Sequence, residues 1–132
     1  MTSLRRVICV EDDPDIRMIL AFSLAPVGGY EVLCCAGGQA ALLQAPDFRP
    51  DLVLLDLMMP DLSSPQTLAA LRALPVMQGV PVVFLTAKAM PDELEQLLQH
   101  DASRVIVKPF NLMTLPADIR PCWEHGRGPG TR

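Results

Sequence analysis

The chain has 132 residues, of which half are hydrophobic and a fifth are charged. This length and composition predict a single globular domain with one hydrophobic core, and they exclude a disordered or low-complexity protein. Acidic residues outnumber basic ones by 15 to 11, for a net charge of −4, and no basic stripe is present that could follow a nucleic-acid backbone, so we expect no direct binding of nucleic acid.

Five short apolar runs rich in β-branched residues predict five strands. Four of the runs are continuous rather than alternating, which is typical of strands buried on both faces of a parallel sheet. The five runs are Val7–Val10, Tyr30–Cys35, Leu52–Leu55, Val80–Leu85 and Val105–Val107.

Helices are predicted between these runs. The first begins at Pro14, with Asp12 or Asp13 as its N-cap. The predicted helices are Pro14–Leu24, which ends near Pro26, then Gln39–Ala45, Pro65–Leu74, Pro91–Gln99 and a last one from about Leu112. We expect Pro116 and Pro121 to shorten or bend the last helix, the domain to span residues 4–124, and residues 125–132 to form a flexible tail.

This alternation predicts an α/β fold, a (βα)5 three-layer sandwich around a parallel five-stranded sheet. In the flavodoxin-like strand order 2-1-3-4-5, ligands bind beyond the carboxyl ends of the strands, where the order reverses. Polar residues follow four of the predicted strands: Glu11, Asp12 and Asp13 follow the first, Asp56 the third, Thr86 the fourth and Lys108 the fifth. The order therefore brings three or four carboxylates to one point, flanked by a hydroxyl and an ammonium group.

Carboxylates that crowd together must be protonated or bind a cation, and Mg²⁺ prefers oxygen ligands of this kind. An aspartate beside Mg²⁺, a lysine and a hydroxyl is suited to attack a phosphoryl group and form an acyl phosphate. Each residue alone has a simpler interpretation: Asp13 as a helix cap, Asp56 as a turn residue, Thr86 as a cap and Lys108 as a surface lysine. Their joint occurrence at four strand ends favours phosphoryl transfer to Asp56.

These motifs resemble the receiver domain of bacterial two-component response regulators. The resemblance covers about residues 5–123 and rests on the segments Val7–Asp13, Asp51–Pro60, Pro81–Ala87 and Val105–Phe110. It implies that Asp56 accepts a phosphoryl group from a histidine kinase or a phosphotransfer protein. With 132 residues, we expect a stand-alone receiver that acts by binding an unknown downstream protein, and homodimer formation is left open.

The resemblance also implies the roles of the other candidate residues. Asp12 would bind Mg²⁺ directly together with Asp56, Glu11 would bind it through water, and the backbone carbonyl of Met58 would complete the protein's ligands. Thr86 and Lys108 would bind the phosphoryl oxygens. Such a protein assists only its own phosphorylation and dephosphorylation and is otherwise not an enzyme.

Other functions fit the sequence less well. A phosphatase with an aspartate nucleophile would need a second aspartate at the position of Met58. The acidic loop after the first strand would repel the phosphate of a flavin. A scaffold or binding module that has lost phosphorylation, a pseudo-receiver, remains an alternative because Val105 stands where many receivers have an aromatic residue. The retention of Asp56 and its predicted partners argues against that alternative.

The cysteines and the N-terminus predict a soluble, cytoplasmic protein. Cys9, Cys34, Cys35 and Cys122 form no CxxC pair and no Cys/His metal-binding spacing, so we expect reduced thiols. The N-terminus has two arginines but only four apolar residues directly before Glu11, so no hydrophobic region of a secretory signal fits there, and no apolar run approaches the roughly 20 residues that cross a membrane.

Overall fold

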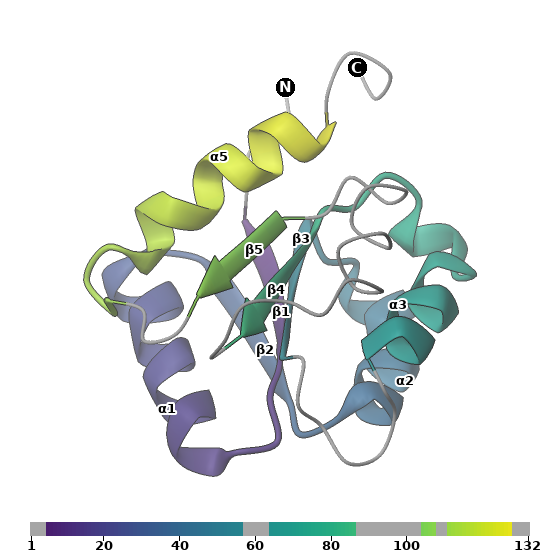
Figure 1. Ribbon diagram of the computed structural model, residues 1–132, viewed down its shortest axis with the longest axis horizontal. Coiled ribbons are helices and arrows are strands. Elements are labelled where there is room, and N and C mark those ends of the chain that lie inside the picture. The colour runs from purple at the N-terminus through teal and green to yellow at the C-terminus, as the bar shows by residue number, and fades with distance from the viewer. Residues whose placement is uncertain (1–4, 57–63, 87–103, 108–110, 128–132) are drawn as a thin grey trace.

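The computed structural model contains one parallel five-stranded sheet of order β2-β1-β3-β4-β5 (Figure 1). It describes residues 5–56, 64–86, 104–107 and 111–127. The strands are β1 (Arg6–Val10), β2 (Glu31–Cys35), β3 (Leu52–Asp56), β4 (Val82–Thr86) and β5 (Arg104–Val107). The predicted fold class and strand order are confirmed, and each strand lies within two residues of its predicted bounds.

Helices cover both faces of the sheet and create two separate hydrophobic clusters. Helices α1 (Pro14–Phe22) and α5 (Leu115–Arg127) lie on one side, and α2 (Gly38–Phe48) and α3 (Ser64–Arg72) lie on the other (Figure 1). Along β1, Val7 and Cys9 pack with the first pair of helices, whereas Ile8 and Val10 pack with the second. Because successive residues face opposite sides, every position needs an apolar side chain, which explains the continuous runs.

The first predicted helix divides into two parts. α1 ends at Phe22 and continues directly into a π-helical turn, η1 (Ser23–Val27). Pro26 lies inside η1 and has no backbone N–H for the carbonyl four residues earlier. The amide of Gly28 instead donates to the carbonyl of Ser23, five residues earlier, at 3.0 Å. The sequence predicts that the helix ends near Pro26. Because the π-helical turn is wider, the helical segment instead ends at Val27, one residue later.

The predicted end of the second helix at Ala45 is wrong. α2 includes Pro46 and continues to Phe48, and Arg49 closes it in the left-handed conformation with φ 56°. A proline in the last turn removes a single hydrogen bond, which the packing of α2 against the sheet offsets. α3 is followed by a short 3₁₀ helix, η2 (Pro75–Met77). The predicted helix Pro91–Gln99 lies outside the described residues.

Helix α5 begins later and ends later than the sequence predicts. Asn111 forms a turn first, because its carbonyl accepts hydrogen bonds from the amides of Thr114 and Leu115. Pro116 then occupies the second helical position, where its missing N–H costs little, and Pro121 lies inside the helix without ending it. The helix continues to Arg127, into the segment predicted as tail. Like the other helices of the described segments, it lacks the length and apolarity needed to cross a membrane.

One carboxylate joins the amino ends of β1 and β3. Asp51 Oδ2 accepts hydrogen bonds from the backbone amides of Arg5 and Arg6, each at 3.0 Å. The amide of Asp51 in turn donates to the carbonyl of Arg6 at 2.7 Å. This clamp stabilises the pairing in which Val7 lies opposite Leu52.

We predict that Asp51→Ala lowers the free energy of unfolding by about 1–3 kcal/mol, because two amides lose a charged acceptor. Asp47→Ala serves as the matched control, since Asp47 is exposed on α2 and its replacement should change stability by less than about 0.5 kcal/mol. Urea denaturation measures both values. Equal effects of the two substitutions would contradict the clamp.

Candidate functional site

Three carboxylates meet at the carboxyl edge of the sheet. β1 pairs with β3 so that Val10 lies opposite Leu55, and the next residues along the two strands are Glu11 and Asp56. Each of Glu11, Asp12 and Asp56 offers a carboxylate oxygen, and these oxygens lie within 4.8 Å of one another. The predicted cluster therefore forms, with three carboxylates.

The three carboxylates differ in their exposure to water. Glu11 is 1% exposed and Asp56 is 3% exposed, whereas Asp12 is exposed. Like charges at this separation repel one another, and burial removes water that would otherwise screen the repulsion. A divalent cation would offset the repulsion, and the donor set, made of carboxylate oxygens with one exposed member, fits an ion such as Mg²⁺ that keeps several water ligands.

Asp13 does not belong to the cluster and caps α1 instead. Its Oδ1 accepts hydrogen bonds from the amides of Asp15 (2.9 Å) and Ile16 (3.4 Å), which identifies it as the N-cap between the two predicted candidates. Its own amide donates to Oε2 of Glu11 at 3.2 Å. Asp13 therefore orients the buried Glu11 carboxylate through its backbone.

Arg17 supports the loop that carries Glu11 and Asp12, a role that the sequence analysis missed. Its Nη1 donates hydrogen bonds to the backbone carbonyls of Glu11 (2.9 Å) and Asp12 (3.0 Å). The available signal was a basic residue one turn into a helix that begins at Pro14, because such a side chain can reach back over the preceding loop. The interaction restricts the backbone of the two candidate metal ligands.

The remaining predicted site residues are placed only in part. Thr86 ends β4, and Leu85 lies opposite Asp56 in the β3–β4 pairing, so the backbone brings Thr86 to the same edge of the sheet. Val105 lies opposite Phe84 in the β4–β5 pairing. Met58 and Lys108 lie outside the described residues, and their predicted roles stay predictions.

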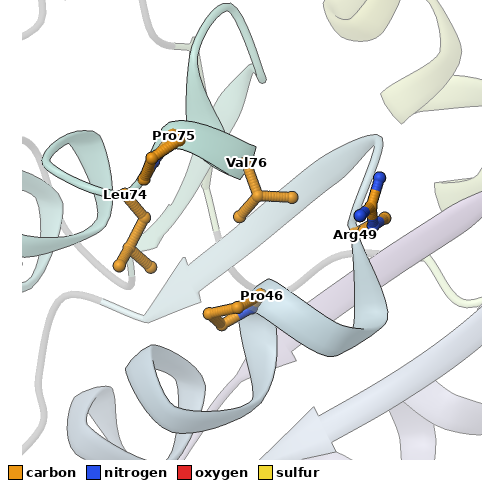
Figure 2. A pocket seen from close by; sticks show the side chains of 5 residues that line it. All are labelled: Pro46, Arg49, Leu74, Pro75 and Val76. Carbon is orange, nitrogen blue, oxygen red and sulfur yellow. The ribbon is translucent and has the colours of Figure 1, made fainter.

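A separate pocket lies near the amino ends of the strands, between the end of α2 and η2 (Figure 2). Among the described residues, its lining combines apolar side chains with one arginine: Pro46, Arg49, Leu74, Pro75 and Val76. α2 precedes β3 and η2 precedes β4, so the pocket lies at the amino edge of the sheet, opposite the edge where Asp56 ends β3, and is not part of the carboxylate site.

Curated relatives match most of the chain. DNA-binding response regulator MtrA of Mycolicibacterium smegmatis is 35% identical over 119 residues, which are 90% of this chain and 50% of that protein. Transcriptional regulatory protein PrrA of Mycobacterium tuberculosis is 36% identical over 115 residues, 87% of this chain and 48% of that protein. The chain thus spans about half the length of these relatives.

Solved structures match the whole sandwich. Chemotaxis protein CheY4 of Vibrio cholerae superposes with a TM-score of 0.83 at 28% identity, over 91% of this chain and 99% of that one. The receiver domain of sensor histidine kinase PA1611 of Pseudomonas aeruginosa, solved with a magnesium ion coordinated in its active-site cleft, gives 0.79 at 27% identity, over 92% of this chain and 99% of that one.

The family model of the response regulator receiver domain matches residues 7–120. That range includes β1 except for its first residue, Arg6, the whole of the other four strands, and the three clustered carboxylates. The chain therefore belongs to the response regulator receiver domain family.

Proposed function

We propose that the protein is a phosphorylatable receiver of a two-component phosphorelay in the cytoplasm. Asp56 accepts a phosphoryl group from a histidine kinase or a phosphotransfer protein in a reaction that depends on Mg²⁺, and the phosphorylated form binds a downstream protein with changed affinity. The observation that carries this proposal is the convergence of Glu11, Asp12 and Asp56, with carboxylate oxygens within 4.8 Å of one another.

The position of Asp56 supports its proposed role as the nucleophile. It is the last residue of a central strand and is 3% exposed, so its carboxylate is held in position with little competing water. In the proposed step, a carboxylate oxygen of Asp56 bonds to phosphorus while the bond between phosphorus and the donor's imidazole nitrogen breaks. The imidazole leaves with the electron pair and takes up a proton, and Asp56 becomes an acyl phosphate.

The proposed metal ligands are those that the resemblance to receiver domains implies, and the cluster of three carboxylates supports them. Asp12 and Asp56 would bind Mg²⁺ directly, Glu11 would bind it through water, and the backbone carbonyl of Met58 would complete the set. When bound, Mg²⁺ offsets negative charge on the carboxylates and on the phosphoryl oxygens. The hydrogen bonds from the Arg17 side chain to the carbonyls of Glu11 and Asp12, and from the Asp13 amide to the Glu11 carboxylate, support the proposal, because they hold the ligand-bearing residues before the ion arrives.

The switch would use the neighbouring strand ends. Thr86 and Lys108 would bind the phosphoryl oxygens and favour a second arrangement of the elements near β4 and β5. A downstream protein that prefers this arrangement would read the phosphorylation. Val105, with a smaller side chain than the aromatic residue common in receivers, leaves that coupling dependent chiefly on Thr86.

We predict that acetyl phosphate with Mg²⁺ adds one phosphoryl group to the wild-type chain. The reason is that the end of β3 holds the buried carboxylate of Asp56 in position, and Mg²⁺ would offset the negative charge there. Asp56→Asn abolishes the adduct, whereas the matched surface variant Asp47→Asn keeps it. Intact-mass spectrometry measures all three proteins. Absence of an adduct on the wild-type chain, under conditions that modify a known receiver, would favour the pseudo-receiver alternative.

Two adjacent aspartates give a second test. Asp12→Ala removes a proposed carboxylate ligand. Because loss of an outer-shell partner alone weakens metal binding by roughly 10-fold or more, this substitution should weaken Mg²⁺ binding by at least that factor. Asp13→Ala should leave the affinity within a few fold while reducing stability by about 1 kcal/mol through loss of the cap. Isothermal calorimetry and urea denaturation measure the two effects. Similar Mg²⁺ affinities in both variants would refute the assignment of Asp12.

A further inference from the structure

Two thiols face each other across the β1–β2 pair, away from the carboxylate site. Cys9 lies opposite Cys34 in the parallel register, and both side chains belong to the cluster under α1 and α5. The two thiols are near enough to shift the pKa values of one another. Neighbouring strands run about 4.8 Å apart, which lies within the range of roughly 4.4–6.8 Å between Cα atoms that a disulfide spans.

The two cysteines differ in their access to solvent. Cys9 is completely buried in a central strand, whereas Cys34 lies on the edge strand β2 and is only partly buried. A small reagent from solution can therefore reach Cys34, while Cys9 can react only with a group already bound to its neighbour. This arrangement divides the pair into an attacking thiol and a resolving thiol.

The surroundings of Cys34 favour the reactive form of its thiol. The Cys34 thiol donates a long hydrogen bond to the backbone carbonyl oxygen of Arg17 at 3.8 Å, which by itself favours the protonated form. The hydrogen bond with Cys9 and the charge of Arg17 outweigh burial and lower the pKa of Cys34 to about 7. Cys35 is the next residue, yet it is buried in the cluster on the opposite face of the sheet. Of these two neighbours, Cys34 is therefore the one that a reagent in solution can reach, and its lowered pKa makes it nucleophilic at neutral pH.

We propose that Cys34 is a hydroperoxide-reactive modification site and that Cys9 converts the oxidised Cys34 into a Cys9–Cys34 disulfide between β1 and β2. Disulfides in reducing compartments are commonly transient and redox-sensing, and a partly exposed thiolate beside a second thiol is the arrangement typical of such sites.

The chemistry needs only a hydroperoxide as oxidant. The Cys34 thiolate attacks one peroxide oxygen, the O–O bond breaks, and the products of hydrogen peroxide are the sulfenic acid of Cys34 and hydroxide. The Cys9 sulfur then attacks the sulfur of Cys34, the S–O bond breaks, and the thiol proton of Cys9 leaves with the hydroxyl group as water. The two sulfurs together lose two electrons, which reduce the peroxide.

The test treats the full wild-type chain at neutral pH with hydrogen peroxide, alkylates the remaining thiols in denaturant and maps the peptides by mass spectrometry. We expect a loss of two hydrogen atoms, a cross-link between the peptides of Cys9 and Cys34, and an alkylated Cys35. Cys34→Ala should abolish the cross-link, and the matched variant Cys35→Ala, changed at the adjacent residue on the other face, should keep it. In Cys9→Ala the sulfenic acid should persist and be trapped by dimedone.

Three results would overturn the proposal, and the wild-type chain alone can give two of them. Oxidation of Cys35 ahead of Cys34 would refute the reactive site. Accumulation of sulfenic or sulfinic acid at Cys34 without a cross-link would refute the resolving role of Cys9. A cross-link that survives in Cys34→Ala would assign the disulfide to other cysteines. None of these readouts depends on phosphorylation of Asp56.

Discussion

The parallel pairing of β1 with β3 is the constraint on which the rest of this structure depends. With Val10 opposite Leu55, the chain leaves both strands at one level, and Glu11 and Asp56 have to meet there. Bringing these charges together costs free energy. Two strands buried on both faces, and clamped at their other ends by Asp51, hold the carboxylates together despite that cost.

Two residues support the loop that carries Glu11 and Asp12. Arg17 binds carbonyl oxygens of this loop, and Asp13 offers its amide to the Glu11 carboxylate while its side chain starts α1. Asp12 itself is exposed. Rigid support of the loop combined with open ligand atoms is the condition for binding a cation without first rearranging the protein.

Much of this architecture could be predicted because its causes are local. Continuous apolar runs indicated buried parallel strands, and the polar residues that follow them indicated the site. The ends of the helices were harder, since Pro26 and Pro46 act through the carbonyls that they leave without a donor, and packing decides whether the helix continues. The role of Arg17 was not predicted, because it depends on how the side chain reaches from α1 back over the loop. The choice between Asp12 and Asp13 as the N-cap depends on the geometry of the same loop.

The alternation of side chains along β2 has a consequence for chemical selectivity. Cys34 and Cys35 are joined by one peptide bond, yet the sheet lies between their thiols, whose pKa values are about 7 and about 11. Both residues are cysteines of the same strand, and they differ only in the face of the sheet on which the side chain lies. A slip of β2 by one residue would exchange their environments. The identity of the more acidic cysteine is therefore a readout of strand register, and thiol labelling of the native protein would report whether β2 is paired correctly.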